Sequence, residues 1–116
     1  MMGSGYYLKA GDNLIVIGKF RENYNDDKYP SIFEAIRKEP PEDKARVLMY
    51  LKSGTVGAIS PGYLHDYVSN IKAAIRNPVC YNDGVYAWRS DVVYYYEHYN
   101  IELPEAFIKH ALQKIK

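Results

Sequence analysis

The chain has 116 residues, 47% of them hydrophobic and 25% charged, and its 15 basic and 14 acidic side chains leave a formal net charge of +1. This length fits one domain, 1–116, since a hydrophobic core rarely divides below about 200 residues. So small a net charge creates no long-range field that attracts nucleic acid or an anionic membrane, and we expect neither as a partner. The single Cys80 excludes an intramolecular disulfide.

Residues 1–20 are predicted to form a hairpin. Two apolar, partly β-branched runs, 6–10 and 14–20, flank the sequence GDN, whose Gly and Asn tolerate the positive φ of a tight turn. The start of the chain has no basic segment followed by an apolar run of about seven residues, the pattern of a secretory signal. Together with the lone cysteine, this favours a cytoplasmic protein.

The next segment is predicted to form a loop and then a short helix. The stretch 21–30 is polar and ends in proline, which is typical of a surface loop. Ser31 and Glu34 have the spacing of a capping box, in which each side chain bonds the backbone N–H of the other residue. We therefore expect a helix over 32–38 that ends before Pro40.

A second helix is predicted over 41–52. Pro41 suits the first helical position, and the two acids after it complement the positive end of the helix dipole. Gly54 is expected to end the helix in the left-handed conformation. With Val47 at its edge, the expected buried face consists of Ala45, Leu48 and Leu51.

The middle of the chain is predicted to hold a strand and then a helix. Residues 55–60 (TVGAIS) indicate a short strand, and the Pro-Gly pair after them indicates a turn. Residues 63–77 carry apolar side chains at helical spacing, which predicts an amphipathic helix, with a loop as the alternative. The apolar face of that helix would consist of Leu64, Val68, Ile71 and Ile75.

A second hairpin is predicted before the last two helices. Strands at 79–81 and 85–88 are joined through NDG, the strongest short hairpin signal in the chain, because these residue types accept the positive φ of a tight turn. Ser90 and Asp91 are expected to cap a helix that ends near Asn100.

Proline also marks the last predicted helix, which opens at Pro104 and Glu105. Its inner face would consist of Phe107, Ile108, Ala111, Leu112 and Ile115. Together the predicted elements define an α+β fold, in which a small antiparallel sheet of two hairpins packs against about four to five short helices.

The helix after Ser90 is rich in tyrosine. Tyr94 and His98 share its outward face, and we expect them to be open to a partner, since rigid aromatic side chains are enriched at interface anchors. Trp88 alternates with Tyr86 on its strand and is expected in the core. The inward face of the helix would consist of Val92, Tyr95, Tyr96 and Tyr99.

The sequence contains no convincing catalytic or metal-binding set. Cys80 with His98 or His110 would provide a nucleophile and a base, but nothing around the cysteine lowers its thiol pKa, so we expect it to be buried and inert. Neither these histidines nor His65 has the H-x-x-x-H spacing of a metal-binding pair. We therefore expect no enzyme, no cofactor and no metal.

Acidic side chains gather between the first hairpin and the second helix, whereas the last helix is basic. If the acidic loop and the helix start lie together, they could attract a basic partner, and the alternative is an ordinary solvated loop. The acidic residues are Glu22, Asp26, Asp27, Glu39, Glu42 and Asp43.

Several short motifs over residues 31–112 resemble a family of short, mostly uncharacterised bacterial proteins. The family pattern is a helix ending in YL-x-SG, then D-G-x-x-x-W, a helix with paired tyrosines, and L-P-x-x-F. The matching pieces here are MYLKSGTV (49–56), DGVYAW (83–88), VYYYEHY (93–99) and LPEAF (103–107). The family is similar to the small immunity proteins encoded beside polymorphic, contact-dependent or type VI secreted toxins.

This resemblance implies a cytoplasmic inhibitor that binds a cognate protein toxin and neutralises it, without catalysis. The candidate surface combines Tyr63, Tyr67, Tyr94 and His98 with the acidic residues between 22 and 43. The alternative is a small-ligand or nucleotide-binding module that uses the tyrosine-rich face as a stacking platform, with a concave aromatic pocket beside Arg89 or Arg76. Residue patterns leave the oligomeric state open.

Overall fold

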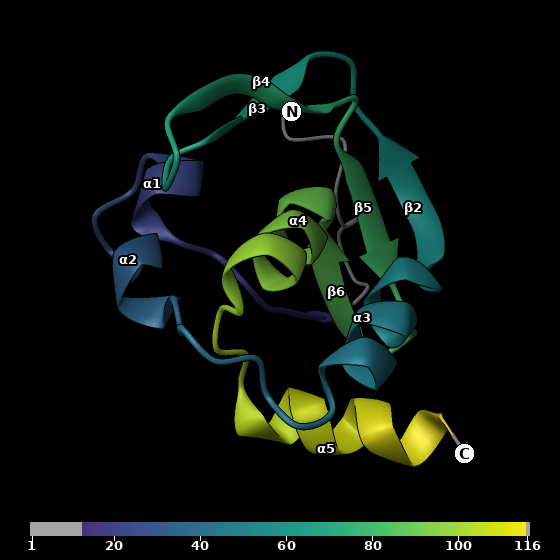
Figure 1. Ribbon diagram of the computed structural model, residues 1–116. Helices are drawn as coiled ribbons and strands as arrows, with labels where there is room; N and C mark the ends of the chain where they lie inside the picture. The colour runs from purple at the N-terminus through teal and green to yellow at the C-terminus, as the bar shows by residue number, and fades with distance from the viewer. Residues whose placement is uncertain (1–12, 116) are drawn as a thin grey trace.

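The computed structural model describes residues 13–115, and Figure 1 shows their arrangement. The fold is α+β, with a four-stranded mixed sheet, a separate two-stranded sheet and short helices. In chain order the elements are β1 (Ile15–Val16), α1 (Arg21–Tyr24), α2 (Ile32–Ala35), α3 (Lys44–Lys52), β2 (Thr55–Ile59), β3 (Tyr63–Asp66), β4 (Ile71–Arg76), β5 (Val79–Asn82), β6 (Tyr86–Arg89), α4 (Ser90–Tyr99) and α5 (Glu105–Lys114). Of the predicted N-terminal hairpin, residues 6–10 lie outside the described residues and 14–20 contribute only β1.

The four-stranded sheet has the order β1-β6-β5-β2. β5 and β6 form the antiparallel hairpin predicted from NDG, and Gly84 in its turn has a φ of 92°. β2 pairs antiparallel with β5, but β1 runs parallel to β6, with Ile15 opposite Tyr86. The sheet is therefore mixed and not purely antiparallel. Hairpin signals connect neighbouring strands only, so they did not predict a pairing between strands this far apart in the chain.

Residues 63–77 form the hairpin β3–β4, so the predicted helix is wrong. Leu64 lies directly opposite Ile75, and side chains that would share a helical face instead meet across two strands. The Asp66 side chain accepts hydrogen bonds from two backbone N–H groups of the turn, and Asn70 adopts a φ of 55° there. The spacing of the apolar residues does not distinguish a helix from a hairpin here, because both structures bring these residues together.

The strands from β2 to β5 form one long bent ribbon, residues 55–82. Two hydrogen bonds carry the pairing through the bend: Ser60 N–H donates to the Pro78 carbonyl and Asn77 N–H to the Gly62 carbonyl, each at 2.8 Å. Figure 1 shows the ribbon leaving the four-stranded sheet and crossing above α4 towards α1. Within residues 13–115, its outer half, β3–β4, is therefore a sheet of two strands that packs against α4.

The first two helices are single turns. α1 occupies the start of the predicted loop, and α2 ends well before residue 38. Ser31 Oγ accepts a hydrogen bond from Phe33 N–H at 3.2 Å, as a capping residue should. The acidic partner of Ser31 is not the predicted Glu34. It is Glu22 of α1, which accepts a hydrogen bond from Ser31 Oγ at 2.6 Å. Local spacing did not reveal this acid, because it comes from another helix.

The buried face of α3 differs from the prediction. The helix starts at Lys44, after the two acids expected in its first turn. Val47 and Leu51 are buried, Leu48 is half-buried and Ala45 is exposed. The buried face is rotated towards Val47 because α3 packs against both α4 and α5, and these two neighbours set its orientation.

The last two helices agree well with their predicted ranges. Asn100 ends α4 with a φ of 52°, and Phe107 and Ala111 bury the inner face of α5. Ser90 does not cap α4 as predicted, because its hydroxyl accepts a hydrogen bond from Val79 N–H at 3.0 Å. This serine instead ties the start of the helix to β5.

Trp88 lies at the centre of the core, between the sheet and the helices. It is 1% exposed, and its indole Nε1 donates to the Leu51 carbonyl at 3.0 Å. Gly54 packs against the indole: a Cβ there would lie 2.8 Å from Trp88 Cζ2 and 2.9 Å from the Cβ of Tyr81. Gly54 does not have the positive φ predicted for a helix stop, so close packing is what requires it.

The variant Gly54→Ala should destabilise the fold by about 1–3 kcal/mol, because the added methyl overpacks the Trp88 site. The matched variant Gly57→Ala has its nearest contact at 3.5 Å and should change stability by less than about 0.5 kcal/mol. Urea denaturation followed by tryptophan fluorescence measures both. Equal stability of the two variants would contradict the packing role of Gly54.

Candidate functional site

A buried carboxylate holds the tip of the ribbon. Asp66, at the end of β3, is 0% exposed. Its Oδ1 accepts two backbone N–H groups of the turn, each at 2.9 Å. Its Oδ2 accepts the hydroxyls of Tyr94 at 2.6 Å and Tyr99 at 2.5 Å. All four donors are neutral, so these hydrogen bonds themselves stabilise the ionised carboxylate.

These contacts set the ionisation of the Asp66 cluster. Burial by itself raises the pKa of Asp66, but the hydrogen bonds from Tyr94, Tyr99 and the backbone outweigh it and lower that pKa. Burial and then the contact with Asp66 raise the pKa of Tyr94, so its hydroxyl keeps the proton that it donates. At neutral pH the cluster is therefore an ionised carboxylate bound by protonated tyrosines.

Tyr95 fixes the same tip from the core side. It is 0% exposed, and its hydroxyl donates to the His65 carbonyl at 3.2 Å and accepts from Tyr67 N–H at 2.9 Å. Three tyrosines of α4 thus bind the ribbon through their hydroxyls. In the sequence, the aspartate itself is a residue type typical of turns. Its tyrosine partners lie about thirty residues further along the chain, so no short motif could have connected them to it.

Three of the four tyrosine-rich candidates lie near the ribbon tip, and the fourth, Tyr63, lies at the other end of β3. Tyr94 is half-buried and not fully outward as predicted, whereas His98 is exposed with its ring centroid 4.5 Å from that of Tyr94. Tyr67 follows Asp66 directly and is 42% exposed. Tyr63 lies at the start of β3, where the Arg76 guanidinium is 5.7 Å from its ring centroid.

Exposed apolar side chains are concentrated on the ribbon. Five of the nine large hydrophobic residues that are exposed in the described chain belong to it. They are Val56, Ile59, Tyr63, Tyr67 and Ile71, which we call the exposed row. Because the Asp66 cluster and the backbone ladders fix the ribbon, these side chains stand on a rigid support.

The acidic candidates do not form one surface. Glu22 already accepts hydrogen bonds from Ser31 Oγ and, at 2.7 Å, from Ile32 N–H. Burial alone raises the pKa of Glu22, and these hydrogen bonds lower it overall. Asp26 accepts from Lys28 N–H in a turn, beside the exposed Asp27. These three acids therefore belong to the α1 region.

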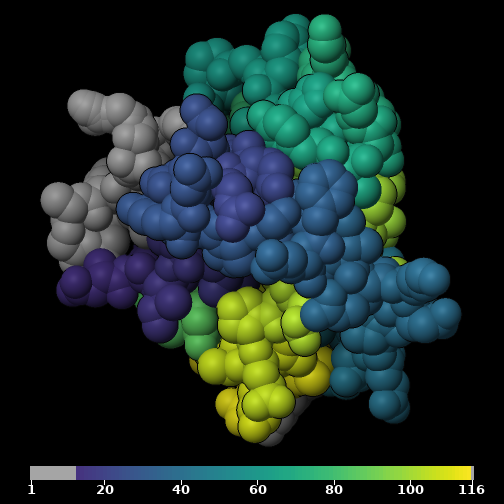
Figure 2. All heavy atoms as spheres, turned by 90° about the vertical axis from the view of Figure 1, so that its left-hand side faces the viewer, coloured from purple at the N-terminus to yellow at the C-terminus, as the bar shows by residue number. Residues whose placement is uncertain are grey.

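The other three acids border a cleft between the segment before α3 and the connection from α4 to α5. Its volume is about 260 Å³, and the buried Tyr96 is among the residues that border it. Figure 2 shows the two segments, blue and yellow, side by side on one face, and Glu102 N–H donates to the Ala35 carbonyl at 2.8 Å between them. We call this the acidic cleft. Its lining consists of Arg37, Glu39, Pro41, Glu42, Asp43, Val47, Tyr96, Asn100, Ile101, Glu102, Leu103 and Ile108.

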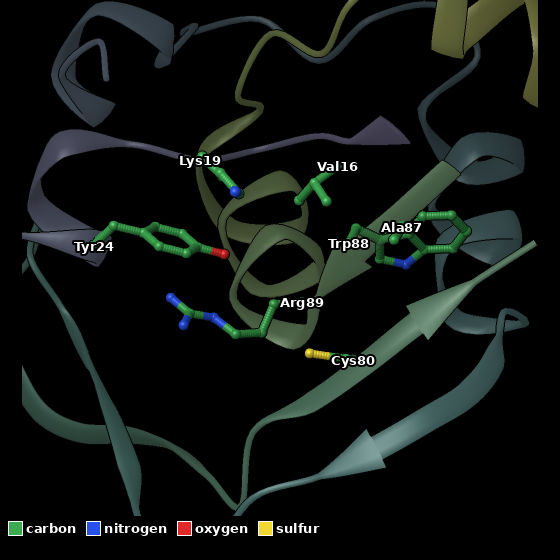
Figure 3. A pocket seen from close by; sticks show the side chains of 7 residues that line it. All are labelled: Val16, Lys19, Tyr24, Cys80, Ala87, Trp88 and Arg89. Atoms are coloured by element: carbon green, nitrogen blue, oxygen red, sulfur yellow. The ribbon is translucent and has the colours of Figure 1, made fainter. Parts of the chain in front are cut away.

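A separate cavity of about 260 Å³ lies beside Arg89. The guanidinium forms a buried ion pair with Asp91 at 2.8 Å and lies 4.3 Å from the ring centroid of Tyr24. Figure 3 shows Arg89 extending towards Tyr24, while Trp88 points away from both. The lining is Val16, Lys19, Tyr24, Cys80, Ala87, Trp88 and Arg89.

The chemistry around Cys80 does not favour a nucleophile. The thiol is 8% exposed, and burial raises its pKa although the charge of Arg89 opposes that shift. A protonated, buried thiol reacts slowly, because the thiolate is the nucleophile. No group of three or more His, Cys, Asp or Glu side chains within residues 13–115 could hold a metal ion.

A second carboxylate, like Asp66, binds backbone N–H groups with one oxygen and side chains of other elements with the other oxygen. Asp83, in the NDG turn, accepts the backbone N–H groups of Val85 and Tyr86 at 2.9 and 2.7 Å. Its other oxygen bonds the Tyr50 hydroxyl and, at 2.8 Å, His110 Nε2. Burial alone raises the pKa of Asp83, and these contacts lower it overall. The cluster ties α3 and α5 to the β5–β6 turn, which places His110 in a structural contact.

Comparison with known proteins found no match to a family model, to a curated protein or to a solved structure. Among the described residues, no helix has the length and apolar character needed to cross a bilayer. The family and the function of the chain therefore remain to be argued from its own residues.

The Asp66 cluster should make stability depend on pH. The folded pKa of Asp66 is lowered, so below about pH 4 the unfolded chain binds more protons than the folded chain and stability falls with pH. Asp66→Asn should cost about 1–3 kcal/mol at pH 7, because one of the two accepting oxygens is replaced by an NH2 group, which leaves two buried donors without an acceptor. The difference from the unaltered protein should shrink as the pH falls through the folded pKa.

Urea denaturation at a series of pH values measures this difference. Asp27→Asn is the matched control, since Asp27 is exposed, and it should change stability by less than about 0.5 kcal/mol at pH 7. A constant gap between Asp66→Asn and the unaltered protein at all pH values would show that Asp66 is not ionised in the fold.

Proposed function

We propose that this protein is a cytoplasmic immunity protein that binds a cognate bacterial effector toxin and neutralises it. The sequence resemblance suggests this class, and the exposed row on the ribbon is the observation that carries the proposal. An inhibitor that acts by binding needs a stable surface of apolar and aromatic anchors, and side chains already held in place lose less entropy on association.

The protein is large enough to provide an interface of ordinary size. A standard complex buries about 800 Å² on each partner, roughly a ninth of the 7056 Å² surface of this protein. The exposed row would supply the apolar centre, because aromatic residues are enriched there, and neighbouring polar residues would form the rim. Tyr63 and Tyr67 are the expected anchors, with His98 beside the tip.

The first test is functional and uses the genomic neighbour. Co-expression of this protein should rescue growth of cells that produce the toxin-like C-terminal domain encoded by the adjacent gene, and the two proteins should copurify. If no such domain is encoded nearby and affinity capture from the native host recovers no protein partner, the proposal is wrong.

The second test is mutational and places the interface. Tyr63→Ala and Tyr67→Ala should each weaken binding of the toxin by about 30-fold or more, as expected for an anchor residue. Met49→Ala, which truncates a 63% exposed side chain on α3, should change affinity less than about twofold. Isothermal titration calorimetry measures affinity, and unchanged urea midpoints establish that the variants fold. Full affinity in both tyrosine variants would place the interface elsewhere.

A small-ligand module is the second candidate, and the cavity beside Arg89 is the observation that favours it. Lys19 and Arg89 provide positive charge there, and Tyr24 provides an aromatic face. The cavity is at the small end for ligand sites and lies away from the tyrosines of α4. This function predicts that adenosine 5′-monophosphate shifts the Ala87 and Trp88 NMR signals saturably and more weakly at high salt. Absence of a saturable shift would exclude it for nucleotides.

A further inference from the structure

Strand β2 is an open edge of the four-stranded sheet. It pairs with β5 on one side, and no described strand lies on its other side, as its outer position in Figure 1 shows. Its residues are all exposed except Ala58, which is half-buried. An edge strand presents unpaired backbone N–H and carbonyl groups, which bind the backbone of another extended strand. This edge therefore has a defined binding chemistry.

β2 also lacks the side chains that usually keep an edge from pairing. Proteins commonly protect an exposed edge with charged residues or proline. β4, an edge of the two-stranded sheet, carries the exposed cations Lys72 and Arg76. By contrast, no lysine, arginine, aspartate or glutamate occurs between Lys52 and His65, and the first proline after β2 is Pro61. No charge on β2 itself therefore opposes the addition of a strand, and pairing would end at Pro61.

A bulge brings two apolar side chains of β2 onto one face of the sheet. Val56 lies opposite Tyr81 of β5. Ile59 lies opposite Val79, two residues from Tyr81 on the same strand, so both pairs are on one face. Gly57 is the extra residue of the bulge, which is why Val56 and Ile59 share a face although they are three positions apart. They form an aliphatic pair, 51% and 63% exposed.

The same two residues direct their backbone groups away from β5. Ser60 N–H donates to the Pro78 carbonyl at 2.8 Å. Because bonding alternates along an antiparallel ladder, the neighbouring Ile59 directs its N–H and carbonyl outwards. Val56 shares the face of Ile59 and therefore its outward direction, since side-chain face and backbone direction alternate together. The outward groups of β2 are thus three residues apart, whereas a regular strand has them two apart.

This spacing favours one kind of partner. A regular strand fits it poorly, because its own bonding groups recur every second residue. A second copy of β2 has the same bulge, and in an antiparallel arrangement it presents its Ile59 to Val56 and its Val56 to Ile59. Both pairs can then form hydrogen bonds at once, and the uncharged strand does not repel its own copy.

We propose that two copies of this protein pair through β2 about a twofold axis. Val56 of each copy lies opposite Ile59 of the other copy, and within each pair the N–H of one residue donates to the carbonyl of the other. The aliphatic side chains then form one continuous strip, and the two four-stranded sheets become a single sheet. This inference is independent of the proposed function, whose anchors Tyr63 and Tyr67 lie beyond Pro61.

Sedimentation equilibrium of the full-length protein measures the association. A pairing this short buries less than about 1,200 Å², the range of weak complexes, so the dissociation constant should be on the order of 0.1 mM. As the concentration passes through this value, the average mass should rise from 13.4 kDa towards twice that mass. A protein that stays monomeric at about tenfold higher concentration overturns the inference. A mass that continues to rise beyond the dimer also overturns it, because a twofold pair is closed.

Charged variants test the register of the pairing. Val56→Lys and Ile59→Glu should each weaken self-association by about tenfold or more, because a charge then lies opposite an aliphatic side chain. An equimolar mixture of the two should form a heterodimer, since the introduced ammonium and carboxylate lie directly opposite each other. A mixture of Val56→Lys with Ile59→Lys should stay monomeric. Ile71→Lys, at a 48% exposed position on β4, is the control and should change the dissociation constant by less than about twofold.

A further measurement needs no substitution. In a mixture of ¹³C-labelled and unlabelled protein, an intermolecular nuclear Overhauser effect should connect the methyl groups of Val56 and Ile59. Unchanged urea midpoints establish that the charged variants fold. A dimer that persists in Val56→Lys and Ile59→Glu, or a mixture of the two that stays monomeric, overturns pairing through β2.

The outcomes are separable from those for the proposed function, because these samples contain no toxin. A monomeric protein overturns the β2 dimer and leaves the immunity proposal standing. A heterodimer that forms only with opposite charges supports the β2 dimer even if no toxin partner is found.

Discussion

The buried carboxylate of Asp66 is the interaction on which the surface of this protein depends. A carboxylate without neighbouring positive charge is costly to bury, and here four neutral donors compensate for the lost water. Two of them come from the turn of the ribbon and two from α4. One carboxylate group therefore closes the hairpin turn through Oδ1 and attaches it to the helix through Oδ2.

This constraint explains the density of tyrosine on α4. Phenylalanine would fill the core equally well, but only a side chain with an apolar ring and a polar tip can both pack inward and bind the ribbon. Tyr94, Tyr95 and Tyr99 do this at the tip. Tyr96 is buried in the core, and its hydroxyl has no hydrogen-bond partner among the described residues. The hydroxyls of α4 are therefore used mainly to hold the ribbon.

Sequence reasoning succeeded where an interaction is local. The NDG turn, the burial of Trp88 and the end of α4 at Asn100 follow from residues close together in the chain. It failed where the partner is distant: the helix predicted over 63–77 is a hairpin held by α4, and the acid that completes the Ser31 cap is Glu22. Periodicity reports which side chains are apolar, but not what they pack against.

By itself, the sequence determined the α+β class, the β5–β6 hairpin, the last two helices and a tyrosine-rich core, because turn chemistry and helical spacing are encoded within a few residues. Only the tertiary structure decided that β1 runs parallel to β6, that the ribbon crosses α4 and that the acidic residues divide between two regions. These features depend on contacts across tens of residues, and the free energy of such contacts comes from burial and hydrogen bonds that exist only after the chain has folded.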